Sequence, residues 1–223
     1  MIKIPFLNKK KNAPQFYKDY ALGFENQKTL SLEEIRFVVF DTETTGLDVR
    51  QDRMLSIGAV SMQGNSINIA DNLEIYLSQD VFKTESVAIH GILKHGKYIQ
   101  VTEEEAVKTF LNYIGNSILV GHHVGFDVAM INYALKRLGA PKLKNIALDT
   151  GVLYKRTIHV VNIMQRDKNY SLDELCKELK IDKEDRHKAA GDAFITALAF
   201  LKIQSKLRTA GVTTLKQLLR KVP

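Results

Sequence analysis

An apolar stretch that runs directly into two acidic residues constrains this chain more than any other feature. From Val38 to Asp48 the sequence reads VVFDTETTGLD, so a β-branched and aromatic run meets Asp41 and Glu43. Residues i and i+2 of a strand point to the same face of a sheet, so we expect these two carboxylates to lie side by side. Neighbouring carboxylates repel each other and resist burial. A bound divalent cation would stabilise the pair, and hard oxygen ligands suit Mg²⁺ or Mn²⁺.

The first half of the chain contains three consecutive segments with the composition of strands. They cover residues 35–43, 54–65 and 66–77, with a Gly64-Asn65 hairpin signal between the last two. Short links between them predict an antiparallel meander. Helices and short strands alternate afterwards, which predicts an α/β fold with a mixed sheet. No Gly-x-Gly-x-x-Gly or Walker sequence supports a nucleotide-binding doubly wound domain.

Helical patterns with recognisable starts fill the second half of the chain. Capping boxes at Thr102/Glu105 and Ser171/Glu174 each predict a helix start. Helices are expected from residue 102 to Gly115 and over 125–139, 171–180, 189–207 and from about 214, with buried strands over 117–122 and 146–150. The inward-facing stripe of the helix over 189–207 is expected to contain Ala190, Ala193, Phe194, Ala197, Leu198 and Leu201.

Composition narrows the class of protein. A hydrophobic fraction of 45% over 223 residues predicts a globular chain that forms its own core. No run of about 18 apolar residues is present, so we expect no membrane partner. The single cysteine, Cys176, excludes a disulfide framework, favours a reducing compartment such as the cytoplasm, and lies at helical spacing among leucines as a core thiol.

The charge is distributed unevenly along the chain. The net charge is +7, no acidic residue precedes Asp19, and none follows Asp192. Basic ends around an acidic middle favour a polyanionic partner such as nucleic acid, although solubility is the alternative explanation. We divide the chain into an N-terminal extension (1–34) whose aromatic residues pack in part on the body, one domain (35–207) and a short basic C-terminal helix or tail (208–223).

Two further acids occupy positions where they would complete a metal site. Asp127 follows a buried strand in GHHVGFD, and Asp192 lies in the first turn of the last long helix in HKAAGDA. His187 precedes Asp192 by five residues, and its imidazole would be suited to accept a proton from water. Taken singly, each acid would more often serve only to complement a helix dipole. The prediction therefore depends on the whole set.

The three motifs FDTETTG, GHHVGFD and HKAAGDA, in that order, resemble those of the DEDDh 3′–5′ exonucleases. The match is closest to the DnaQ-like branch, which includes the proofreading epsilon subunit of bacterial DNA polymerase III, and it covers roughly residues 36–207. IHGI (89–92) and LDT (148–150) are similar to further landmarks of that family. The resemblance implies a ribonuclease H-like fold.

The resemblance also implies roles for individual residues. Asp41, Glu43 and Asp192 would bind one Mg²⁺ or Mn²⁺, Asp41 would bridge to a second ion assisted by Asp127, and His187 would be the general base. The residues implied to contact the terminal nucleotide are Thr42, Thr44, Thr45, Gly46, Leu47 and His90. For Leu47 a wedge against the last base and an ordinary core position are both open, and His90 is more often structural.

Several functions remain in competition at this point. The Thr-Thr-Gly form of the first motif favours DNA as substrate, cleaved at the 3′ end of a single strand to give nucleoside 5′-monophosphates in replication proofreading or repair. An RNA exonuclease similar to ribonuclease T or oligoribonuclease is the alternative. A non-catalytic nucleic-acid-binding subunit is a weaker one, because all four acids and the histidine are present. Association with a DNA polymerase subunit is a further possibility.

Overall fold

A mixed sheet organises the computed structural model, which describes residues 13–25, 30–80, 91–92, 98–158, 168–183 and 186–220. The strand order is β4-β3-β2-β1-β5-β6. The strands are β1 (Arg36–Thr44), β2 (Met54–Gln63), β3 (Ser66–Leu77), β4 (Gln100–Val101), β5 (Ile118–Gly121) and β6 (Ala147–Asp149). The first three pair antiparallel, whereas β5 is parallel to β1 and β6 to β5. The predicted meander and mixed sheet are confirmed.

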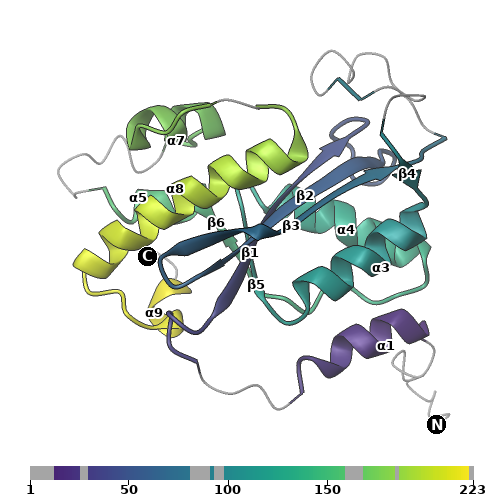
Figure 1. Ribbon diagram of the computed structural model, residues 1–223, viewed down its shortest axis with the longest axis horizontal. Helices are drawn as coiled ribbons and strands as arrows, with labels where there is room; N and C mark the ends of the chain where they lie inside the picture. The colour runs from purple at the N-terminus through teal and green to yellow at the C-terminus, as the bar shows by residue number, and fades with distance from the viewer. Residues whose placement is uncertain are drawn as a thin grey trace, which may run out of the picture.

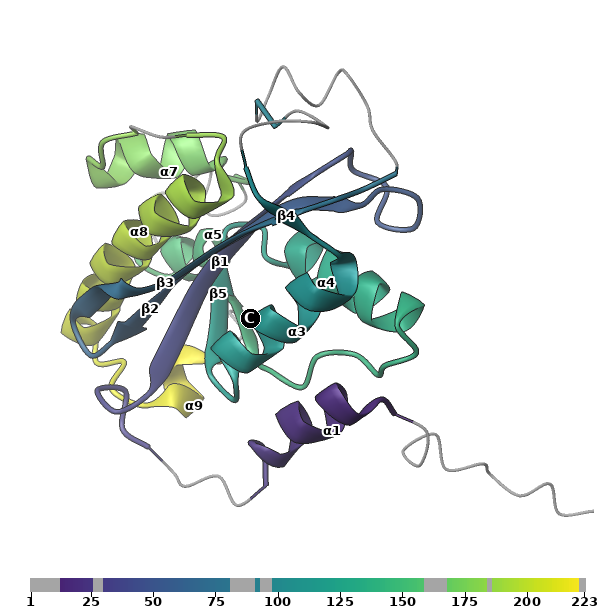
Figure 2. The same cartoon turned by 45° about the vertical axis from the view of Figure 1, so that its right-hand side comes forward.

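Helices cover both faces of this sheet (Figures 1 and 2). They are α1 (Gln15–Leu22), α3 (Glu103–Ile114), α4 (Gly125–Arg137), α5 (Thr150–Lys155), α7 (Leu172–Leu179), α8 (Ala189–Thr209) and α9 (Leu215–Leu218). The α8 helix lies across β1 and β2 on one face, with α5 and α7 packed against it, and α3 and α4 lie on the other face. Both predicted capping boxes form.

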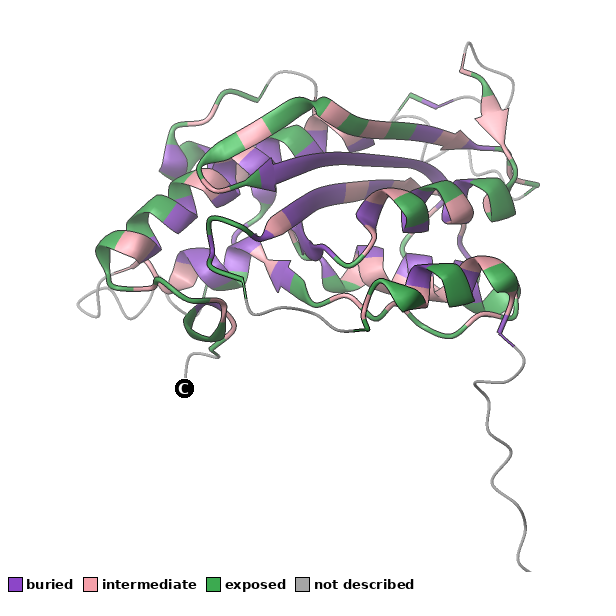
Figure 3. Cartoon of the chain, turned by 60° about the horizontal axis from the view of Figure 1, so that its bottom comes forward, coloured by how far each residue is buried: buried purple, intermediate pink, exposed green. Residues whose placement is uncertain are grey.

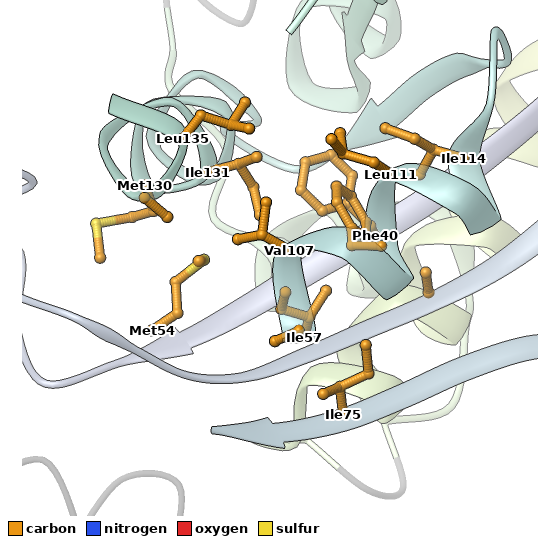
Figure 4. Packing of buried hydrophobic residues seen from close by; sticks show 14 of the residues in the cluster. Phe40, Met54, Ile57, Ile75, Val107, Leu111, Ile114, Met130, Ile131 and Leu135 are labelled. Atoms are coloured by element: carbon orange, nitrogen blue, oxygen red, sulfur yellow. The ribbon is translucent and has the colours of Figure 1, made fainter. Parts of the chain in front are cut away.

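The alternation of side chains along β1 divides the core in two. Val38 and Phe40 join the cluster with α3 and α4, where Phe40 lies among the residues of Figure 4. Phe37 and Val39 join the cluster on the α8 face. Figure 3 shows the middle strands buried along most of their length and β3 exposed along much of its own. The β1 strand therefore runs through the middle of the molecule. The residues after its apolar part, from Asp41 to Thr44, lie at the edge of the core.

The N-terminal extension contributes a helix that the sequence analysis did not predict. The Tyr17 hydroxyl donates to the Lys142 carbonyl at 2.6 Å, and the Tyr20 hydroxyl pairs with the side chain of Asn145. The expected packing of these aromatics on the body is therefore confirmed. A helix of eight residues offers too few turns for a period to show. The proposed limits of extension, domain and tail stay a prediction.

The inward-facing stripe predicted for α8 is wrong in phase. Phe194 is 36% exposed, and Ala190, Leu198 and Leu201 are only partly buried, whereas Ala193 and Ala197 are buried as expected. Ile195, Ala199 and Phe200 form the buried positions instead. The sheet on one side and α5 and α7 on the other bury most of the helix circumference, so no single stripe defines it. The α5 helix, directly after β6, was also missed.

Cys176 is a buried free thiol, as expected. Within the described part of the chain, no helix combines the length and the apolar character that a membrane crossing requires.

Candidate active site

The acidic end of β1 lies directly under the start of α8. Asp41 is paired with Gly58 of β2, and Glu43 with Ser56. A Cβ atom on Gly58 would lie 2.1 Å from the carbonyl carbon of Ala189 and the amide nitrogen of Ala190. Glycine at this position therefore allows the backbone of α8 to approach the sheet closely. The first turn of α8 is thereby placed over β1, and that turn contains Asp192.

Three of the predicted metal ligands converge at this point. Asp41, Glu43 and Asp192 each contribute a carboxylate oxygen, and these oxygens all lie within 4.8 Å of one another. Asp192 is buried, and the two acids of β1 are partly buried. The expectation that Asp41 and Glu43 project together is confirmed by the geometry, and their role as ligands remains a prediction.

The electrostatics of the cluster reflect this crowding. Burial raises the pKa of Asp41 well above its usual range, and the charges of Asp127, Asp192 and Glu43 raise it further. Burial, followed by the charges of Asp192 and Asp127, raises the pKa of Glu43 to about 7. Both shifts mean that the ionised carboxylates lack sufficient positive charge around them. A divalent cation would supply it.

Asp127 lies beside the cluster and is held from the opposite face of β1. Its Oδ1 accepts from the amide nitrogen of Thr42 at 3.0 Å and from the Thr42 hydroxyl at 2.6 Å. Its carboxyl is buried, and burial raises its pKa to about 7 although both bonds from Thr42 lower it. Thr42, predicted as a substrate contact, thus connects the first and second motifs.

The loop before α8 contributes an arginine that the sequence analysis missed. Arg186 pairs with Oδ1 of Asp192, and its Nε lies 3.1 Å from Oδ1 of Asp173 on α7. Its charge lowers the pKa of both Asp41 and Glu43. A basic residue directly before the predicted general base was the available signal in the sequence.

His187 adjoins the cluster through its backbone. Its amide nitrogen donates to Oδ2 of Asp192 at 3.3 Å, and its imidazole is exposed. Its φ angle of 64° lies in the left-handed region, which is uncommon for a residue with a side chain. The exposure of His187 and its backbone contact with Asp192 are in keeping with the predicted role in proton transfer.

The predicted nucleotide-contacting residues lie in and directly after β1. Thr45 is buried, Thr44 and Gly46 are partly buried, and Leu47 is 85% exposed. The exposure of Leu47 excludes the alternative of a core leucine. His90 lies outside the described residues.

The donor set fits a hard divalent cation. It consists of one carboxylate oxygen each from Asp41, Glu43 and Asp192 at the acidic end of β1, and burial raises the pKa of both β1 acids. Carboxylate ligands are those that Mg²⁺ and Mn²⁺ prefer in proteins. Of the described residues, only these three form a group of this kind.

Comparison with known proteins places this geometry in a family. A family model described as "Exonuclease" (RNase_T) matches residues 38–200. The DNA polymerase III PolC-type of Thermotoga petrophila is 30% identical over 188 residues, covering 84% of this chain and 13% of that protein. The corresponding protein of Caldanaerobacter subterraneus subsp. tengcongensis is 32% identical over 190 residues, covering 83% and 13%. The chain thus spans a small part of the length of these relatives.

Solved structures share the fold. Exonuclease X in complex with a 5′-overhanging DNA duplex superimposes with a TM-score of 0.58 and 23% identity, over 82% of this chain and 96% of that one. E. coli Exonuclease I in complex with a dA16 oligonucleotide gives a TM-score of 0.66 and 16% identity, over 79% and 42%. The predicted ribonuclease H-like architecture is confirmed. With its three motifs in order and the family model matched over most of its length, the chain belongs to the exonuclease family.

Proposed function

We propose that this protein is a metal-dependent 3′–5′ exonuclease that hydrolyses phosphodiester bonds at the 3′ end of DNA and releases nucleoside 5′-monophosphates, in replication proofreading or repair. The observation that carries the proposal is the convergence of Asp41, Glu43 and Asp192 within 4.8 Å at the end of a buried strand. Burial and mutual repulsion make this arrangement costly for the fold, and a bound divalent cation would offset that cost. Asp127 and His187 adjoin them.

The carboxylates are assigned to two divalent ions, Mg²⁺ or Mn²⁺. Asp41, Glu43 and Asp192 would hold one ion, and Asp41 with Asp127 the second. Two such ions, when bound, stabilise the charge that develops on the attacking and leaving oxygens of a phosphodiester displacement.

The remaining steps fall to the side chains of the chain itself. The exposed imidazole of His187 takes a proton from the attacking water. Arg186, already at the edge of the cluster, contributes positive charge beside the negative phosphate. The segment from Thr44 to Leu47 forms the floor for the terminal nucleotide, and the exposed side chain of Leu47 contacts the last base.

DNA is the proposed substrate because relatives that are 30% and 32% identical to this chain are named as DNA polymerases. The same relatives support association with a DNA polymerase as a partner. The single cysteine supports a reducing compartment, and we propose the cytoplasm.

The test is cleavage of end-labelled oligonucleotides. Single-stranded DNA and RNA of one sequence, labelled at the 5′ or the 3′ end, are incubated with the full chain in Mg²⁺, Mn²⁺ or EDTA. We expect stepwise shortening of the 5′-labelled DNA, immediate release of the 3′ label as a mononucleotide, and no cleavage in EDTA.

Each alternative has its own outcome in this assay. Faster cleavage of RNA than of DNA would show that the substrate is RNA and would contradict the proposal of DNA. Internal cuts would contradict the exonuclease mode. Binding without cleavage in either metal would favour the non-catalytic reading.

A further inference from the structure

The turn that connects β1 to β2 is built around a buried carboxylate. Asp52 is 1% exposed. Its Oδ1 accepts from the hydroxyl of Thr45 at 2.7 Å, and its Oδ2 accepts from the amide nitrogen of Asp48 at 2.9 Å. An ionised carboxylate is costly to bury unless it is hydrogen-bonded, and these two donors come from either side of the turn. The carboxylate therefore ties the two sides together from within.

Thr45 is fully engaged in this arrangement. Its hydroxyl donates to Asp52 and accepts from the amide nitrogen of Arg53 at 3.0 Å, and its own amide nitrogen donates to the Arg53 carbonyl at 2.9 Å. Thr45 is also 1% exposed. Its side chain therefore connects the turn to the start of β2 and points away from solvent.

Gly46 wraps closely around the same carboxylate. A Cβ atom at Gly46 would lie 2.5 Å from Oδ2 of Asp52 and 2.9 Å from its Cγ. The Gly46 carbonyl accepts from the hydroxyl of Thr44 at 2.8 Å, which fixes the peptide from the outside. Leu47 follows directly and is 85% exposed, so a rigid backbone presents a large apolar side chain to solvent.

We propose that Asp52 is the positioning residue for the terminal nucleotide. It acts by holding the backbone from Thr45 to Asp48, so that Leu47 is already in place for the last base. Fixing this backbone before binding removes an ordering cost that would otherwise reduce affinity. The inference rests on the proposed function, because it assigns a role within the same site.

The test separates nucleotide positioning from a purely structural role. Asp52→Asn preserves the shape of the side chain, but its amide group cannot accept from both Thr45 and Asp48. In the full chain, we expect KM for single-stranded DNA and the dissociation constant for thymidine 5′-monophosphate in Mn²⁺ to rise about tenfold, the size of one lost hydrogen bond to a charged group. We expect kcat and the affinity for Mn²⁺ to stay within about twofold of the wild type.

Asp19→Asn is the matched control. It removes the same charge from an exposed position on α1, where the carboxylate accepts from the Gln15 side chain. We expect wild-type affinity for the mononucleotide. Equal loss in both variants would overturn the proposal, because it would trace the effect to net charge.

A second pair of variants uses the contact with Gly46. Gly46→Ala places a methyl group against the carboxylate, so it should also weaken mononucleotide binding. In an Asp52→Ala background the same change should weaken binding little further, because the clashing atoms are gone. Additive losses would contradict a shared mechanism.

Two failures are distinguishable. A wild-type chain that neither cleaves DNA nor binds the mononucleotide would overturn the proposed function, and this inference with it. If the wild type cleaves DNA and binds the mononucleotide, only this inference is overturned when Asp52→Asn binds the mononucleotide as well as the wild type does. It is also overturned if Asp52→Asn has a lower kcat, a weaker affinity for Mn²⁺ and a higher KM together.

Discussion

Two pairs of residues on the same face of β1 have opposite effects on stability: Phe37 and Val39 in its apolar half, and Asp41 and Glu43 in its acidic half. Phe37 and Val39 point toward α8 and are buried in its cluster. Asp41 and Glu43 continue the same alternation toward the same helix and form the acidic cluster with Asp192. The first pair stabilises the fold by removing apolar surface from water, whereas the second pair opposes it through mutual repulsion.

This difference shows how the fold accommodates a site that works against its own stability. The acids occupy the last part of a strand whose earlier residues are buried on both faces, so the core fixes the backbone that carries them. A rigid strand places charged groups more accurately than a loop does. The apolar half should therefore control stability, and the acidic half activity.

The largest expected effect comes from the acidic half. Asp41→Asn removes a carboxylate that both proposed ions need, and we expect DNA cleavage to fall by at least about 10³-fold, equivalent to roughly 4 kcal/mol in the barrier. In EDTA the melting temperature should stay the same or rise, because one repelling charge is gone. Cleavage rates and thermal melts of the same preparation check both. Activity above a tenth of wild type would contradict the assignment.

Phe37→Ala should have the reverse profile. Phe37 is 1% exposed and packs edge-to-face on Phe200 at a ring distance of 5.2 Å. We expect the free energy of unfolding to fall by about 3–5 kcal/mol, with wild-type cleavage per folded molecule at low temperature. Denaturant titration measures the loss. Ile69→Ala, at a position that is 66% exposed, is the control and should change stability little.

Gly58→Ala tests the close approach of α8 to the sheet beside Asp41, because Gly58 of β2 is paired with Asp41. The new methyl group would overlap the backbone of Ala189, so α8 must shift and carry Asp192 away from Asp41. We expect a stability loss of about 1–3 kcal/mol together with weaker Mn²⁺ binding. Gly23→Ala, where a Cβ atom makes only ordinary contacts, should alter neither. Unchanged Mn²⁺ affinity in Gly58→Ala would separate α8 packing from the site.

The smallest expected effect is a pH dependence of the metal-free protein. Burial and the charges of Asp192 and Asp127 raise the pKa of Glu43 to about 7. The folded state therefore binds the proton more tightly than the unfolded chain, so this contribution to stability is full below the ordinary value of 4.5 and is lost as pH rises through 7. In EDTA the melting temperature should fall across that window. This fall in melting temperature with pH should be smaller in Glu43→Gln. An identical slope in the variant and the wild type would show that Glu43 is not its cause.

Much of this architecture is predictable from local patterns. Alternation along β1 places Asp41 and Glu43 on one face, and the capping boxes at Thr102 and Ser171 define two helix starts. These features depend on neighbours in the sequence, so a single sequence contains them.

The rest depends on contacts between distant segments. The approach of α8 to Gly58 and the pairing of Arg186 with Asp192 exist only once the chain has folded. The buried face of α8 was predicted wrongly because alanines occur around much of the helix and because the sheet, α5 and α7 pack against it on several sides. Asp52 resembles an ordinary turn residue in sequence, and only its burial reveals its part in the β1–β2 connection.

We propose that Asp41 and Glu43, in the acidic half of β1, bind divalent ions. The most direct test is to titrate the full chain with Mn²⁺. Electron paramagnetic resonance reports binding as a loss of the signal of free Mn²⁺. We predict saturable binding at the wild-type site, weakened strongly in Asp41→Asn and preserved in Phe37→Ala at a temperature where that variant is folded. Equal Mn²⁺ binding by wild type and Asp41→Asn, or none by either, would contradict the account.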